Sequence, residues 1–195
     1  LEQDNHDHDM EYLHGSEKSY TGHHEYTHSH EYPHEHRGMK EITEIIQKSE
    51  MTVRAKKMAM RVFDILAQAE SKAHGVPVEE VHFHEVGAVD SIVDIAAIAI
   101  CMDNLDISNV IVPVLYEGTG FIRCQHGQIP VPVPAVTHIA ETHKLKLKIT
   151  DIQGELVTPT GAAVVAAFRT SDRLPEDFTM LKTGIGAGKR QYRCP

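Results

Sequence analysis

Aliphatic side chains are almost absent from the first 38 residues of this 195-residue chain and are common in the remainder. A segment this polar buries too little apolar surface to offset the entropy that it would lose on becoming ordered. The sequence therefore confines a hydrophobic core to residues 39–195. We expect one globular domain there, preceded by a His-rich flexible segment over residues 1–38.

Charge and cysteine content narrow the functional classes. The formal net charge is −9, which argues against binding to nucleic acid or to an anionic membrane and fits a small-molecule or metal partner. No apolar run is long enough to span a bilayer, and the start does not resemble a signal peptide. Cys101, Cys124 and Cys194 include no CxxC pair, so we expect reduced thiols in a cytoplasmic protein.

Hydrophobic periodicity predicts alternating helices and strands between residues 39 and 195. Helices are expected at 39–48, 53–73, 91–105, 134–142 and 160–168, with Thr52 and Asp90 as N-caps and Gly75 ending the second helix. Strands are expected at 81–86, 110–115, 120–124, 145–149 and 178–184. This order predicts an α/β domain (mixed α+β layers) in which helices pack on a small mixed sheet.

Two histidines and three carboxylates lie close together in the stretch VHFHEVGAVDSIVDI, residues 81–95. His82 and His84 share one face of the expected strand, and Glu85 and Asp90 flank the turn that follows it. Such a set would bind a divalent ion or act as an acid and a base. Alternatively, Asp90 only caps a helix and a histidine bonds a backbone carbonyl. Because the neighbouring side chains are apolar and leave little surface for solvent, we favour a functional role for the set.

Two further stretches carry weaker signals. Cys124 and His126 share a strand face, and a thiolate with an imidazole suits nickel or zinc. This pair gains weight only if it faces His82 and His84, since an isolated Cys is often a small buried side chain.

The second of these stretches, Gly154–Ala163, enters a helix of small residues whose backbone N–H groups would meet an anion closely. With the hydroxyls of Thr158 and Thr160, and with Gly161, it would suit the phosphate or carboxylate of a nucleotide-like ligand. The alternative is a simple N-cap at Thr160.

Several stretches together resemble the nickel-insertion proteins of the LarC type. They are HSHEYPHEHRGMKEITEII, AESKAHGVPVEEVHFHEVGAVDSIVDI, CQHGQIPVPVPA, GELVTPTGAA and GIGAGKR, and the resemblance runs from about His28 to Pro195. Members of this family make the nickel-pincer nucleotide cofactor of lactate racemase. The resemblance implies a nickel chelatase, a lyase-type enzyme that inserts nickel into a pyridinium bisthiocarboxylate mononucleotide. It also implies CTP with Mg²⁺ or Mn²⁺, and the racemase apoprotein as a partner.

Two departures from the family pattern concern the ends of the chain. The family's short strand and Gly-Ile-Ser-Gly-Asp-like start are absent, and the sequence stops before the domain to which CTP binding is attributed. We therefore expect a chain truncated at both ends, with its CTP site elsewhere. Cut edges would expose apolar surface and favour a homo-oligomer.

Chemistry suggests roles for the candidate residues within such a reaction. We expect nickel to be handled by His82, His84, Glu85, Cys124 and His126, because nickel prefers borderline ligands. Glu85 or Asp90 would accept the ring proton that leaves when a metal–carbon bond forms. Thr158, Thr160 and Gly161 would hold the substrate phosphate.

Two other functions compete with nickel insertion. Nine of the fifteen histidines lie in the first 36 residues, which would suit a non-catalytic nickel storage or delivery protein. The third hypothesis is a metal-dependent hydrolase that acts on a phosphorylated small molecule.

Overall fold

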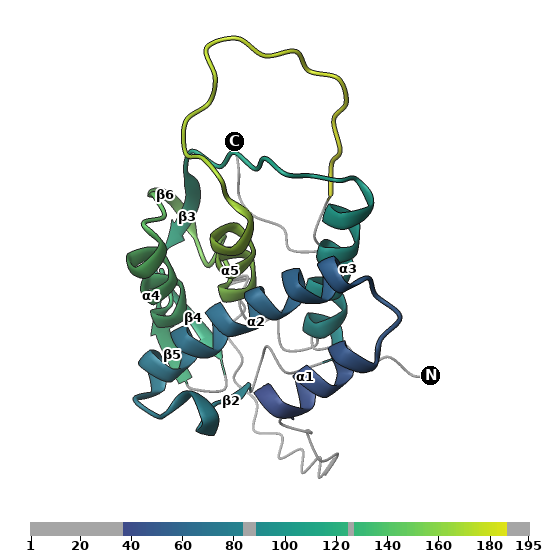
Figure 1. Ribbon diagram of the computed structural model, residues 1–195. Helices are drawn as coiled ribbons and strands as arrows, with labels where there is room; N and C mark the ends of the chain where they lie inside the picture. The colour runs from purple at the N-terminus through teal and green to yellow at the C-terminus, as the bar shows by residue number, and fades with distance from the viewer. Residues whose placement is uncertain (1–36, 84–88, 125–126, 187–195) are drawn as a thin grey trace, which may run out of the picture.

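A computed structural model describes residues 37–83, 89–124 and 127–186 (Figure 1). In chain order its elements are β1 (Arg37–Gly38), α1 (Met39–Lys48), α2 (Val53–His74), the 3-10 helix η2 (Val78–Glu80), β2 (His82–Phe83), α3 (Val89–Asn104), β3 (Leu115–Thr119), β4 (Phe121–Cys124), β5 (Gly127–Pro130), α4 (Pro134–His143), β6 (Leu147–Gln153) and α5 (Pro159–Phe168). The expected α/β class is confirmed. Residues 1–36 lie outside the described residues, so the proposed division at residue 38 stays a prediction.

The long helix α2 occupies the centre of the molecule, and α1, α3, α4 and α5 all pack against it. Its boundaries follow from local chemistry. The Thr52 side chain accepts a hydrogen bond from the Ala55 N–H at 3.0 Å, and Gly75 ends the helix with a φ of 68°. Both predicted boundary residues are therefore confirmed. None of the described helices is long and apolar enough to cross a bilayer.

Small side chains let α5 lie close to α2. Four alanines of α5 are buried in the common core, and large core side chains such as Phe63 and Leu66 come from α2. The buried members of α5 are Ala162, Ala163, Ala166 and Ala167.

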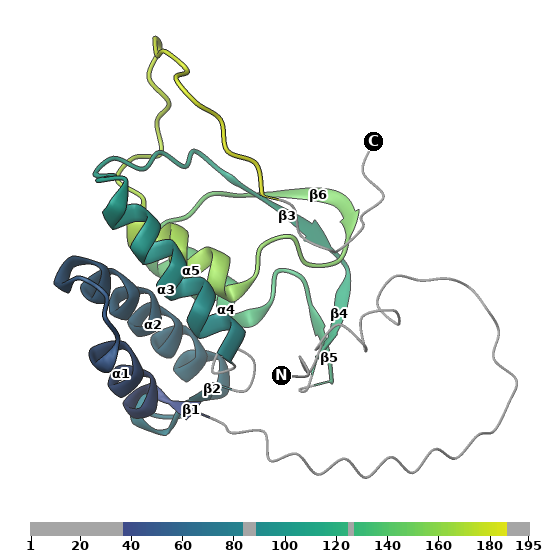
Figure 2. The same ribbon diagram turned by 90° about the vertical axis from the view of Figure 1, so that its right-hand side faces the viewer.

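The strands form three pairs within the described residues. β1 pairs with β2 and β4 with β5, both antiparallel, whereas β3 and β6 are parallel. Figure 2 shows α1, α2 and α3 along one side of the molecule and strands β3 to β6 along the other.

Three sequence expectations are wrong. Helix α3 begins at Val89, so Asp90 lies in its first turn and is not its N-cap. The strand expected at 110–115 does not form: β3 covers Leu115–Thr119, and Ile111 makes only an isolated bridge to Ser171. No strand forms at 178–184: this segment is exposed and pairs with no strand among the described residues.

Gly118 in β3 marks a close approach of two backbones. A Cβ atom on Gly118 would lie 1.8 Å from the carbonyl oxygen of Gly154. We expect Gly118→Ala to lower the free energy of unfolding by about 3 kcal/mol, because the backbones must separate. Urea denaturation measures the change. Gly184→Ala serves as the control, since a Cβ there meets nothing within 4 Å, and equal losses in the two variants would contradict the explanation.

Candidate functional site

Of the five predicted nickel ligands, the structure describes only the backbone of His82 and the residue Cys124. His82 lies in β2 opposite Gly38 of β1, and Cys124 is the half-buried last residue of β4. His84, Glu85 and His126 lie outside the described residues. Their convergence stays a prediction.

In both views, β2, the first turn of α3 and the turn end of the β4–β5 hairpin lie in the half of the molecule away from the projecting 172–182 segment, with α3 and the hairpin apart from each other (Figures 1 and 2). The β1–β2 pairing also fixes where residues 1–36 join the fold, because the chain enters β1 at Arg37, opposite Phe83. The His-rich segment is thus attached beside the strand that carries His82.

Carboxylates in this half of the molecule are open to solvent. Asp90 and Asp94 are exposed and lie one helical turn apart on α3, and the Asp90 Oδ1 accepts a hydrogen bond from the Ser91 N–H at 2.9 Å. Across residues 37–83, 89–124 and 127–186, no three His, Cys, Asp or Glu side chains are placed to hold one metal ion. A metal site in this half therefore requires ligands outside the described residues.

The residue that caps the N-terminus of α5 is not the one named from the sequence. Thr158, rather than Thr160, is the N-cap, and its Oγ1 accepts a hydrogen bond from the Gly161 N–H at 3.1 Å. Two of the three groups predicted to contact a phosphate therefore bond to each other. The phosphate contact of Thr158, Thr160 and Gly161 stays a prediction.

Glu117, which lies between the strands expected at 110–115 and 120–124, is a fully buried carboxylate beneath the segment that leads into α5. Its Oε1 accepts hydrogen bonds from the N–H groups of Gly118, Leu156 and Val157 at 2.7, 2.8 and 3.1 Å. Its Oε2 is buried and has no hydrogen-bond partner among the described residues. The only feature of the sequence that pointed to burial of Glu117 was its position within the apolar run before β4.

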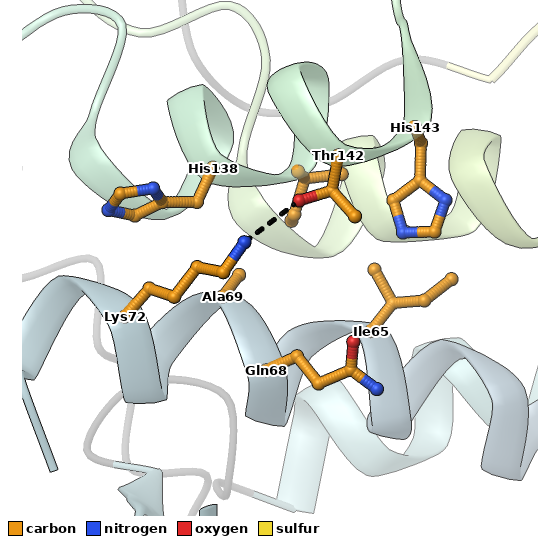
Figure 3. A pocket seen from close by; sticks show the side chains of 8 residues that line it. Ile65, Gln68, Ala69, Lys72, His138, Thr142 and His143 are labelled. Carbon is orange, nitrogen blue, oxygen red and sulfur yellow. Dashed lines mark hydrogen bonds between the residues drawn. The ribbon is translucent and has the colours of Figure 1, made fainter.

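A narrow groove separates α2 from α4 (Figure 3). Lys72 donates a hydrogen bond to the Thr142 Oγ1 at 3.1 Å across it, and Arg169 donates to the His143 carbonyl oxygen at 2.9 Å. The groove has a volume of about 10 Å³, which holds roughly one water molecule. The groove is a small polar gap between the two helices and is too small for a nucleotide.

Positive charges surround one imidazole of this groove. Burial lowers the pKa of His143, and the neighbouring charges of Arg61, Arg169 and Lys72 lower this pKa further. His143 is therefore favoured in its neutral form in the folded protein.

Replacing Glu117 tests its role in holding the segment before α5. Glu117→Ala leaves three buried N–H groups without their acceptor, so we expect a loss of about 3 kcal/mol in the free energy of unfolding. Glu117→Gln keeps one acceptor oxygen and should lose less. Urea denaturation measures both, with the exposed Glu141→Ala as a control expected within about 0.5 kcal/mol of the parent. A loss no larger than that of the control would contradict this role.

Stability should depend on pH through His143. Its folded-state pKa lies below its unfolded value, so the unfolded chain binds the proton more readily. The stabilising contribution is complete above the unfolded pKa of about 6.5 and is lost as the pH falls towards the folded pKa. We expect His143→Gln to show a smaller loss of stability than the parent between pH 7.5 and 5.5, measured by urea denaturation. Equal losses in the two proteins would show that His143 does not contribute.

Comparisons with known proteins match this chain to one family. The family model described as "Nickel insertion protein" covers residues 5–195. The chain is 54% identical over 154 residues to the pyridinium-3,5-bisthiocarboxylic acid mononucleotide nickel insertion protein of Alkaliphilus metalliredigens, covering 79% of this chain and 37% of the relative. Proteins of the same name from Acetivibrio thermocellus and Clostridium acetobutylicum are 40% and 43% identical over 88% and 80% of this chain, and over 40% and 37% of their own lengths.

The chain therefore spans about two fifths of the length of these curated relatives. No solved structure gives a significant match to it. Since the family model covers nearly the whole sequence, the chain belongs to the nickel insertion protein family.

Proposed function

We propose that this chain takes part in inserting nickel into a pyridinium-3,5-bisthiocarboxylic acid mononucleotide, acting as a nickel chelatase. The observation that carries the proposal is the family match over residues 5–195, together with the names of relatives at 40–54% identity. Nickel is here a substrate that is passed on to the nucleotide. The CTP and the Mg²⁺ or Mn²⁺ implied by the resemblance are proposed to bind outside this chain, and the racemase apoprotein to receive the product.

The nickel-handling groups are proposed to be His82, His84, Glu85, Cys124 and His126. Imidazole and thiolate are ligands that suit nickel. Support comes from the placement of β2 and the β4–β5 hairpin in the same half of the molecule, with Cys124 half-buried at the end of β4. A loosely held ion at an incomplete site would suit transfer to the nucleotide.

A base is needed if a ring C–H is exchanged for a nickel–carbon bond. Asp90 is exposed in the first turn of α3 and lies in the same half of the molecule as β2, so its carboxylate is open to a substrate there. We propose that Asp90 or Glu85 accepts that proton.

Nickel storage or delivery through the His-rich segment is the second candidate function. It rests on the nine histidines within residues 1–36 and on their attachment beside β2. Storage and insertion differ in where the tight nickel site lies. The hydrolase hypothesis differs in its product, since it predicts phosphate release from a phosphorylated small molecule without any sulfur-containing acceptor.

Nickel calorimetry on a variant that lacks residues 1–36 separates the first two functions while keeping strand β1. We expect one tight site in this variant, because the proposed ligands all follow residue 81. Adding His82→Ala and His84→Ala should weaken nickel binding by at least 100-fold. His74→Ala with His138→Ala is the matched control, since both residues lie on helices and neither is a proposed ligand, and it should leave the affinity within twofold.

Two outcomes would count against the insertion site. If the variant lacking residues 1–36 binds no nickel, the capacity belongs to the His-rich segment and storage becomes the better explanation. If the site survives the loss of His82 and His84, nickel is held elsewhere in the fold.

A further inference from the structure

The outward side of α3 is apolar and open. Helix α3 packs on α2 through its other side, and Figure 2 shows none of the labelled helices or strands crossing in front of it. The exposed large side chains of this region are Val89, Val93, Ile100 and Leu105, with exposed fractions of 61%, 57%, 38% and 70%. A contiguous apolar surface of this kind is typical of an interaction site.

The apolar side chains on this side are spaced symmetrically about Ala97. Val93 and Cys101 lie four residues before and after it, and Val89 and Leu105 lie eight residues before and after it. We call these five residues the outer row of α3. Residues four apart form one ridge on a helix surface, and such ridges pack against each other in the commonest class of helix pair. The outer row reads the same in both directions, as a contact between two identical copies requires.

The centre of the outer row permits a close approach. Ala97 is exposed at the middle of Val89–Asn104, and the outer row contains no charged residue. In an antiparallel pair, Ala97 of one copy would lie beside Ala97 of the other. Val93 of each copy would then lie beside Cys101 of its partner. The protein already uses small side chains in this way where the buried alanines of α5 pack on α2.

Charges beside the outer row favour the antiparallel arrangement. Arg54 at the start of α2 pairs with Asp106 just beyond the end of α3, so these two helices run in opposite directions. Lys57 is exposed one turn further along the same face of α2 as Arg54, and the described residues offer it no ion pair.

The other end of α3 carries the opposite charge. Asp90 and Asp94 are exposed there, and neither has an ion pair among the described residues. An antiparallel partner would bring these carboxylates towards Lys57. It would also oppose the two helix dipoles, which is favourable, so charge complementarity points to a second copy.

We infer that two copies of this chain pair through the outer row of α3, antiparallel about a two-fold axis beside Ala97. The 16 residues of α3 give a contact about 24 Å long. A contact of one helix with another lies at the low end of interface sizes, which fits a dimer that dissociates at micromolar concentration. The inference uses none of the proposed nickel ligands, so it stands whether or not the chain inserts nickel.

Sedimentation equilibrium of the 195-residue chain tests the pairing. We expect a monomer–dimer equilibrium between roughly 1 and 100 µM protein. Ala97→Glu should weaken the dimer by about 100-fold or more, because two carboxylates would face each other at the axis. Ala73→Glu is the matched control, since Ala73 is an exposed alanine of α2 outside the outer row, and it should leave the dissociation constant within about twofold. Circular dichroism checks that both variants keep the fold.

Disulfide cross-linking tests the geometry of the pair. In a chain whose three native cysteines are replaced by alanine, Ala97→Cys should form a covalent dimer on mild oxidation, because the axis brings the two copies of this position together. Ala73→Cys in the same background should stay monomeric on a non-reducing gel.

Three outcomes would overturn the inference. If the chain stays monomeric up to about 100 µM, no second copy covers α3, and its outer row is left for a segment of the longer relatives. If Ala97→Glu dimerises as readily as the parent, another surface holds the dimer. If Ala97→Cys and Ala73→Cys cross-link equally, α3 does not lie at the axis.

Discussion

Burial of one side of α2 is the interaction on which the described fold depends. Phe63 and Leu66 are fully buried, and burial of side chains this large contributes about 1.5–3 kcal/mol each. Because four other helices pack on α2, its position fixes theirs. The opposite side of the same helix carries the exposed residues Lys57 and Arg61.

A buried carboxylate organises the strand half of the molecule. Glu117 gathers three backbone N–H groups at a place where the parallel β3–β6 ladder is interrupted and the chain turns into α5. Backbone groups buried at such an interruption need an acceptor, and a side chain supplies it. This arrangement positions the segment that leads into α5.

A different constraint acts where β2 carries the proposed nickel ligand His82. The antiparallel β1–β2 pair holds the junction with the His-rich segment opposite the strand that carries His82. Covalent attachment keeps a tethered segment at high effective concentration near the point where it is attached. Metal gathered by residues 1–36 would therefore be released close to His82, which is compatible with either insertion or delivery.

Features set by local chemistry were predictable from the sequence. Thr52 and Gly75 bound α2 because a hydroxyl cap and a left-handed glycine act on backbone groups within four residues of them. The small side chains of α5 and the first position of α4 at Pro134 are local in the same sense. The family resemblance, carried by contiguous motifs, was likewise readable without a structure.

Tertiary structure decided whatever depends on partners distant in the sequence. The apolar run around Glu117 does not by itself establish its burial, because two of its hydrogen-bond donors, Leu156 and Val157, lie about forty residues away. Val89 and Val93 are apolar yet exposed, because α3 meets α2 along only one stripe. The segment 178–184 was expected to be a strand, yet it is exposed and pairs with no strand among the described residues. Helix caps and the periodicity of apolar residues depend on residues close together in the sequence. Burial and strand pairing depend on contacts that form only when the whole chain has packed.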